Sequence, residues 1–299
     1  MTAPRQVLPG TTHLVTRRCS ERRFFLRPSA LTNGIFLYVL AVAARRHGVL
    51  VHAFCVLSNH YHLLVTDPDA RLPAFMQYLD SLVARATNAS LGHWEGFWSS
   101  EASYSAVSHG SGDDVVRKAA YVLANPVSAG LVQHGREWPG LWTAPEQLGA
   151  TTLTAPRPKT FFRAKGDMPE SAELVLSVPP GFASAQEFQD AVAAAVCELE
   201  GKTRREFQNE QRGFLGRARV LAQKPFARPA PGEPRRKLSP RVAARDKWKR
   251  IEALARLVGF LRVYRDALAS MRAGDRDAIF PAGTYLLRIE HGVRCAALE

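Results

Sequence analysis

The chain of 299 residues has few cysteines, no long apolar run and little acidic charge in its last third. Its four cysteines lie far apart and form no C-x-x-C pair, so we expect reduced thiols in a cytoplasmic protein rather than a disulfide scaffold. The longest apolar run, 35–44, is too short to span a bilayer. The first residues lack the apolar segment of a signal peptide, so none is expected.

The positive charge of the chain is concentrated at one end. Residues 1–200 carry 17 basic and 17 acidic side chains, whereas residues 201–299 carry 23 and 10 and account for the net charge of +13. This asymmetry favours a polyanion as partner of the C-terminal third. Arginine dominates there and pairs bidentately with phosphate, so nucleic acid is the expected partner; the alternative is a solvated basic surface.

Apolar periodicity in the first half of the chain alternates between strand and helix patterns. The order is strand, helix, strand, strand, helix, strand, which is that of a ferredoxin-like α/β sandwich with an antiparallel sheet. We expect the third and fourth segments to be a hairpin of two central strands. The predicted elements are strand 11–19, helix 28–48, strands 49–57 and 60–66, helix 72–91 and strand 102–107.

The composition changes after residue 142, where threonine, proline and glycine become frequent. We therefore predict a domain at 1–145, a linker at 146–182 and a mainly helical, basic C-terminal region at 183–299. This region contains a proline-rich connector at 224–240 and a long helix at 241–272. The long helix has an apolar stripe, expected in a core, and nearby cations expected to contact DNA. The stripe is Trp248, Ile251, Ala255, Val258 and Leu261, and the cations are Arg245, Lys247, Lys249 and Arg250.

A histidine pair begins the strand at 60–66. Side chains alternate along a strand, so His60 and His62 share one face while Tyr61 points to the other. Two adjacent imidazoles can hold one metal ion. The alternative is an incidental pair of surface or core histidines.

A polar ridge runs along the next predicted helix, which begins near Ser111 and ends before Pro126. Asp114, Lys118, Tyr121 and Asn125 recur at helical spacing and line up on one side. A tyrosine on such a ridge is available for chemistry. The alternative is an ordinary interfacial tyrosine.

These residues suit phosphodiester chemistry when they are combined. A tyrosine is a weak nucleophile near neutral pH because its pKa is about 10. A divalent ion held by His60 and His62 would polarise a phosphate and orient it toward the phenol of Tyr121. Asn125 could complete the coordination or hold a phosphate, and Lys118 could favour the phenolate or bind DNA.

The same motifs resemble those of a known family, the HUH-type single-strand DNA transposases, and specifically the REP-associated tyrosine transposases. The resemblance covers about residues 8–142. The last of its three blocks, with tyrosine followed by Asn-Pro-Val and Ala-Gly, is the most specific. The matching blocks are GTTHLVTR at 10–17, SNHYHLLV at 58–65 and YVLANPVSAGLV at 121–132.

The resemblance implies an HUH nuclease domain that cleaves single-stranded DNA near a hairpin and leaves a 5′-phosphotyrosine and a free 3′-hydroxyl. It maps the metal-binding histidines onto His60 and His62, the nucleophile onto Tyr121 and the third metal-side residue onto Asn125. The implied metal is Mg²⁺ or Mn²⁺. Three positions depart from the family pattern: Ser58 replaces a frequent proline, and Ser128 and Ser99 replace frequent basic residues.

Three hypotheses follow. The first is a transposase-like, metal-dependent endonuclease and strand transferase that cleaves and rejoins single-stranded or hairpin-associated DNA in the nucleoid. The second is a non-catalytic or weakly catalytic hairpin-DNA regulator, and the third is an α/β protein with incidental histidines. In the first two we expect DNA contacts from the basic cluster Arg17, Arg18, Arg22 and Arg23. A homodimer that composes the site from two chains is left open.

Overall fold

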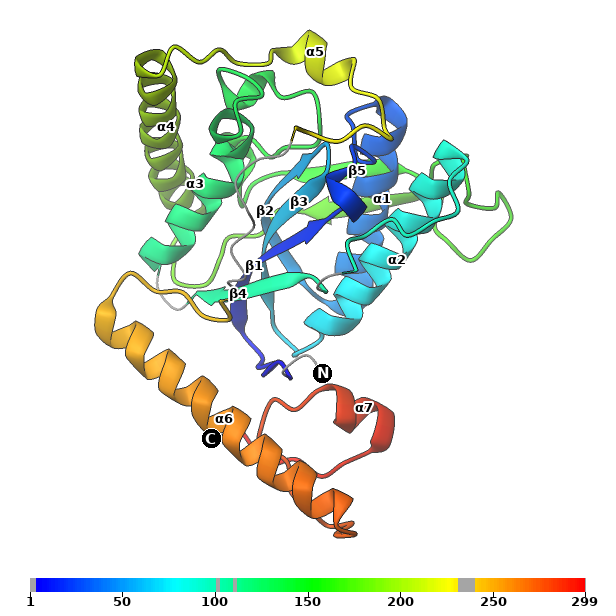
Figure 1. Ribbon diagram of the computed structural model, residues 1–299, viewed down its shortest axis with the longest axis vertical. Helices are drawn as coiled ribbons and strands as arrows, with labels where there is room; N and C mark the ends of the chain where they lie inside the picture. Colours follow the sequence, from blue (N-terminus) through cyan, green and yellow to red (C-terminus); the bar gives the residue numbers. More distant parts are fainter. Residues whose placement is uncertain (1–3, 101–102, 110–111, 231–239, 299) are drawn as a thin grey trace.

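The computed structural model describes residues 4–100, 103–109, 112–230 and 240–298 (Figure 1). Its strands are β1 (Thr11–Arg18), β2 (Leu50–Leu57), β3 (His60–Asp67), β4 (Ser105–His109), β5 (Thr152–Pro156) and β6 (Ser171–Val175). Its α-helices are α1 (Ala30–His47), α2 (Leu72–Leu91), α3 (Gly112–Ser128), α4 (Ala185–Asn209), α5 (Arg217–Leu221), α6 (Lys247–Arg272) and α7 (Leu286–His291). Among the described residues, none of the helices has the length and apolar character that a membrane span requires.

The first six elements form the predicted α+β sandwich. The four strands make one antiparallel sheet in the order β2-β3-β1-β4, and α1 and α2 cover one face (Figure 1). The expectation of two central hairpin strands is wrong for β2, which lies at the edge of this sheet. Its outer backbone groups are bonded instead to coil, because Val56 N donates to Leu141 O and Ser177 N donates to Val51 O.

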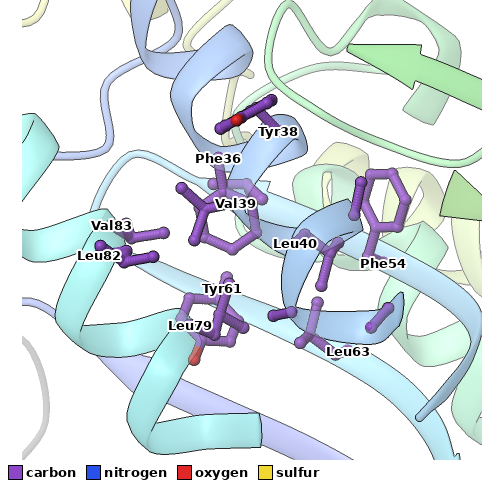
Figure 2. Close-up of a cluster of buried hydrophobic side chains, with 14 of the residues drawn as sticks. Phe36, Tyr38, Val39, Leu40, Phe54, Tyr61, Leu63, Leu79, Leu82 and Val83 are labelled. Carbon is purple, nitrogen blue, oxygen red and sulfur yellow. The ribbon is translucent and has the colours of Figure 1, made fainter. Parts of the chain in front are cut away.

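The main core lies between the sheet and the pair α1 and α2, as Figure 2 shows. Apolar side chains of α1 meet those of β2, β3 and α2 there. Tyr61 is fully buried in this layer, where its ring packs edge-on against Phe36. Burying one such side chain stabilises the fold by about 1.5–3 kcal/mol, so this layer holds β3 firmly in register. The labelled members are Phe36, Tyr38, Val39, Leu40, Phe54, Tyr61, Leu63, Leu79, Leu82 and Val83.

The opposite face of the sheet is covered by α3, and α4 packs on α3 (Figure 1). Helix α4 begins after Ser184, whose hydroxyl accepts from Glu187 N. Its stripe Phe188, Val192 and Val196 shares a buried cluster with Val122 of α3. The start of the C-terminal region therefore packs against α3, the helix that carries Tyr121. The division into domains at 145 and 183 stays a prediction.

Residues 146–182 differ from the extended linker that their composition predicts. They contain the hairpin β5–β6, which packs along α1. Ala155, Ala172 and Leu174 are buried in the main core. Thr152, Thr154 and Pro156 occupy the exposed positions of β5, so the composition concealed two short strands.

Helix α3 also differs slightly from its prediction. It continues through Pro126 to Ser128, rather than ending at Asn125. A proline in the last turn removes only one helical hydrogen bond, which leaves the turn intact. The predicted cap Ser111 and residues 231–239 of the predicted connector lie outside the described residues.

Helix α6 ends at Arg272 as predicted but begins at Lys247, six residues after the predicted start, and its expected core stripe is wrong. Trp248 is 73% exposed and Val258 is 64% exposed. A different side of the helix is packed: Phe260 and Ala267 are buried, and Ala267 meets Phe280 in a small separate cluster. Apolar residues occur on two sides of α6, so spacing alone could not identify the packed one.

Buried histidines predict an acid-sensitive fold. Burial lowers the pKa of His52 from 6.5 to about 4, although its bond to Ser177 O opposes this shift. In the unfolded chain His52 binds a proton below about pH 6.5, whereas in the folded chain it does so only below about pH 4. The free energy of unfolding therefore falls as the pH falls through this window. Burial lowers the pKa of His13 and His109 similarly. Asp80 opposes this effect, because burial raises its pKa to about 7.

We therefore expect the free energy of unfolding, measured by urea titration without metal, to fall between pH 7 and pH 5. In His52→Gln the fall should be smaller by about 2 kcal/mol, because one histidine no longer titrates. His291→Gln, which changes an exposed ring, is the control and should keep the wild-type dependence. Equal pH dependence in His52→Gln and wild type would show that His52 is not held neutral by the fold.

Candidate active site

The histidine pair lies where β3 begins, on the face of the sheet covered by α3. His60 pairs in register with Arg18 of β1, and His62 pairs with Thr16. The two imidazole centroids are 4.9 Å apart with nearly perpendicular rings. The strand alternation predicted this shared face, and the continuous apolar sequence of β3 fixes it by burying Tyr61 and Leu63 on the opposite side.

Two polar side chains orient the imidazoles. His60 Nδ1 lies 2.6 Å from Asn59 Oδ1, and His62 Nδ1 lies 2.7 Å from Thr16 Oγ1. An amide oxygen accepts only, so Nδ1 of His60 carries its proton and Nε2 keeps a free lone pair. For His62 the same tautomer follows from Asn125 Nδ2, a donor 3.2 Å from Nε2. Nε2 of His60 is thus available as a ligand, whereas Nε2 of His62 accepts from the Asn125 amide and becomes a ligand only when that amide turns away.

The surroundings keep both imidazoles neutral. Burial, followed by the charges of Arg18 and Arg22, lowers the pKa of His60 to about 3. Burial, followed by His60 and Arg18, lowers the pKa of His62 well below its usual value. Neutral imidazole is the form that binds a metal, so this environment favours ligation at neutral pH.

Helix α3 brings the predicted tyrosine and asparagine to the same histidines within one chain. The rings of Tyr121 and His62 meet edge-on with centroids 5.3 Å apart. Asn125, one turn later, contacts His62 Nε2. Tyr121 remains 42% exposed, whereas Asn125 is buried. Lys118 Nζ lies 5.7 Å from the centroid of the Tyr121 ring, on the same ridge of α3.

The neighbouring tyrosine of the motif, Tyr61, lies on the other side of the sheet. Its hydroxyl donates to Asp80 Oδ1 at 2.5 Å, and it is fully buried. Arg17 belongs to this side too, since its Nε lies 3.8 Å from Asp80 Oδ2. The phenol of Tyr61 is therefore separated by the sheet from any phosphate bound at the histidines.

The predicted basic residues are only partly gathered around the histidines. Arg18 and Arg22 are exposed and close enough to lower the pKa of His60. Arg23 is paired with Glu21 at 3.2 Å. The four predicted cations of the C-terminal region lie at the start of α6, near the other end of α3, where Arg245 N donates to Asp114 Oδ1. They are Arg245, Lys247, Lys249 and Arg250, and all are exposed.

Two site residues were not identified from the sequence, Thr16 and Asn59. Thr16 contacts His62 only because β1 pairs with β3 in this register, which the sequence of either strand alone does not specify. Asn59 could have been found, because it precedes His60 directly and its short amide can reach the adjacent imidazole.

The donor set is two imidazole nitrogens and one amide. No group of three His, Cys, Asp or Glu side chains suited to a metal occurs among the described residues. A set of two histidines and an amide leaves several coordination positions to water and to phosphate oxygens, as Mg²⁺ and Mn²⁺ sites acting on phosphates commonly do. Neutral, oriented imidazoles can ligate a divalent transition-metal ion, whereas Mg²⁺ would depend mainly on the amide, water and phosphate oxygens.

The chain is similar in structure to two solved transposases. One, described as a REP-associated tyrosine transposase bound to a REP hairpin, is 17% identical with a TM-score of 0.40, covering 47% of this chain and 81% of that chain. The other, a putative transposase from Deinococcus radiodurans R1, is 21% identical with a TM-score of 0.29, covering 38% and 89%. Neither the protein-family models nor the curated proteins gave a match. At these TM-scores the similarity does not establish an activity, which must be argued from the chain's own residues.

Proposed function

We propose that this protein is a transposase-like endonuclease that cleaves and rejoins single-stranded DNA through Tyr121. The observation that carries the proposal is the contact of Tyr121 and Asn125 with His62 inside one chain. Two pairs of residues that are distant in sequence meet there, His60 and His62 of β3 with Tyr121 and Asn125 of α3. Together they have the chemistry that phosphodiester cleavage needs. The hypothesis of incidental histidines does not explain why the exposed phenol of Tyr121 lies against the buried, neutral imidazole of His62.

In the proposed step the phenolic oxygen of Tyr121 attacks the phosphorus of a phosphodiester. A tyrosine–phosphorus ester forms and the bond from phosphorus to the 3′-oxygen breaks. The phenol gives its proton to solvent, and the departing 3′-oxygen takes up a proton to become a hydroxyl. Attack by a 3′-hydroxyl on the phosphotyrosine reverses these changes and rejoins a strand.

Cationic side chains around the phenol suit this step. Lys118 is half-buried beside the Tyr121 ring, where its charge attracts a phosphate. Arg18 and Arg22, beside His60, are placed to hold phosphates of the incoming strand. These are electrostatic roles, so they should weaken as the salt concentration rises.

A divalent ion, Mg²⁺ or Mn²⁺, would be held by Nε2 of His60 and His62 and, once the Asn125 amide turns its nitrogen away from His62, by the amide oxygen of Asn125. When bound it supplies positive charge to the oxygens of the scissile phosphate. The role of the chain itself is to present both imidazoles neutral and with fixed tautomers, through Thr16 and Asn59.

The contact with Thr16 gives a testable prediction. Thr16→Val removes the acceptor for His62 Nδ1 and should weaken Mn²⁺ binding about 10- to 100-fold, measured by calorimetry. Thr16→Ser keeps a hydroxyl and should stay close to wild type. Thr12→Val is the matched control, because Thr12 lies on the same strand and its hydroxyl contacts Thr66. Unchanged Mn²⁺ affinity in Thr16→Val would argue against His62 as a ligand.

The experiment that tests the proposed function uses the full chain and a labelled hairpin oligonucleotide with unpaired flanks. With Mn²⁺ we expect a protein–DNA adduct that survives denaturation and a second product ending in a 3′-hydroxyl. The adduct should be lost when EDTA is added first. If no adduct or nick forms while the hairpin binds, the regulator hypothesis is supported and the enzyme hypothesis is contradicted.

A further inference from the structure

A cavity of about 720 Å³ lies between the edge of the main sheet and α6. Its two ends are fixed by backbone contacts between distant segments. Ser108 of β4 donates to Arg241 O, before α6, and Val7 donates to Gly283 O, after α6. In Figure 1 the C-terminal helices lie apart from the sheet between these attachments. The cavity is therefore a gap between two separately packed parts of the chain.

The lining of this cavity combines cationic and aromatic groups. Arg5 packs over the Tyr104 ring with its guanidinium carbon 3.8 Å from the ring centroid. Lys249 and Arg256 project from one side of α6, and Phe260 lies on the same side. Two carboxylates, Asp114 and Glu252, also line it; Asp114 already pairs with Arg117. Arg5 covers the Tyr104 ring and Phe260 is buried, so the rest of the lining is mainly apolar, and apolar walls with a few charged donors are typical of a small-ligand pocket.

His13 adds a buried polar group whose hydrogen-bonding capacity is unused. Both of its ring nitrogens are buried and have no hydrogen-bond partner among the residues that the structure describes, and the residue is only 8% exposed. Leaving such a group unsatisfied destabilises the folded chain. Burial, and then the nearby His109 and Arg5, lowers the pKa of His13 to about 4. A neutral imidazole has one donor and one acceptor, which match the edge of a nucleobase.

We propose that this cavity binds an unpaired nucleotide of the DNA strand that leads to Tyr121, with His13 contacting the base and Arg256 and Lys249 contacting its phosphates. The inference rests on the proposed function and assigns a place to the strand beyond the cleaved bond.

The helix α3 connects the cavity to the candidate active site. Asp114 lines the cavity, and Asp114, Lys118 and Tyr121 follow one another along the same ridge. Tyr121 lies seven helical positions after Asp114, a rise of about 10 Å. A few nucleotides of a DNA strand cover this distance, since even stacked nucleotides are about 3.4 Å apart. His13 lies on the face of β1 that also carries Val15 and Arg17, opposite the face of Thr16 and His62, so a strand would pass Lys118 and then turn round the edge strand β4 to occupy both places.

The test measures binding rather than cleavage. A short, fluorescently labelled unpaired oligonucleotide is titrated with the full chain in EDTA, and anisotropy is recorded. Arg256→Ala and His13→Gln should each weaken binding about fivefold or more at low salt, and Arg256→Ala should lower the salt slope by about 0.7. The matched control is Arg262→Ala, which removes the same charge from α6 at a residue outside the cavity lining.

Arg256 lies at the surface, so its substitution leaves the fold intact even where that of buried His13 does not. Equal affinities for Arg256→Ala, Arg262→Ala and wild type would overturn the cavity assignment. That result would leave adduct formation by Tyr121 untouched. Conversely, an adduct that persists without Tyr121 would contradict the proposed nucleophile and leave the binding result standing.

Discussion

Tyr121→Phe should abolish the covalent protein–DNA adduct, with a loss of at least about 10³-fold in its rate of formation. The substitution removes one oxygen atom and keeps the ring that packs against His62. Hairpin binding should remain within about twofold of wild type, because phosphate contacts by cations supply most of the affinity. A loss confined to the chemical step identifies the phenol as the attacking group.

Tyr78→Phe is the control for this substitution. Tyr78 is a partly buried tyrosine of α2 whose hydroxyl contacts Met168, and its loss should leave adduct formation unchanged. The rates are measured by separating labelled adduct from free oligonucleotide on denaturing gels. Adduct formation by Tyr121→Phe at the wild-type rate would assign the nucleophile to another residue.

His62→Ala should give the second large effect, a fall of about 10²-fold or more in adduct formation together with loss of tight Mn²⁺ binding. His62 contacts Thr16, Asn125 and Tyr121, so its removal takes away a ligand and the group that positions the helix residues. Mn²⁺ binding, followed by electron paramagnetic resonance, gives a readout that does not depend on activity. Thermal unfolding checks that the variant folds.

The control His291→Ala changes an exposed ring at the end of α7 and should bind Mn²⁺ as wild type does. Mixing His62→Ala with Tyr121→Phe tests whether the site lies within one chain. We expect the mixture to stay inactive, because each chain lacks one half of its own site. Recovered activity would mean that histidines and tyrosine from different chains work together.

The sequence was sufficient to predict the sandwich and the histidine face because both depend on local periodicity. The alternation in β3 placed His60 and His62 opposite Tyr61, and the structure has Tyr61 buried against Asp80. The ridge of α3 likewise followed from helical spacing. That Tyr121 meets His62 could not follow from spacing, since it depends on how α3 packs across the sheet through Val122 and Leu123.

Other features depended on contacts between distant segments. The exposed stripe of α6 around Val258 was expected to be buried, because an apolar pattern does not say which side finds a partner. Thr16 was missed because its role follows from pairing with His62 across two strands. The cavity at His13 is lined by the N-terminal segment, β4 and α6, and the sequence of any one of these segments does not predict it.

Attack on DNA by the Tyr121 phenol beside His60 and His62 can be tested by digesting the wild-type adduct with protease and nuclease and analysing the modified peptide by mass spectrometry. We expect a nucleotide phosphate on the peptide that contains Tyr121, with the ester on the tyrosine itself. A modification on Tyr61, on another tyrosine or on a serine would contradict it.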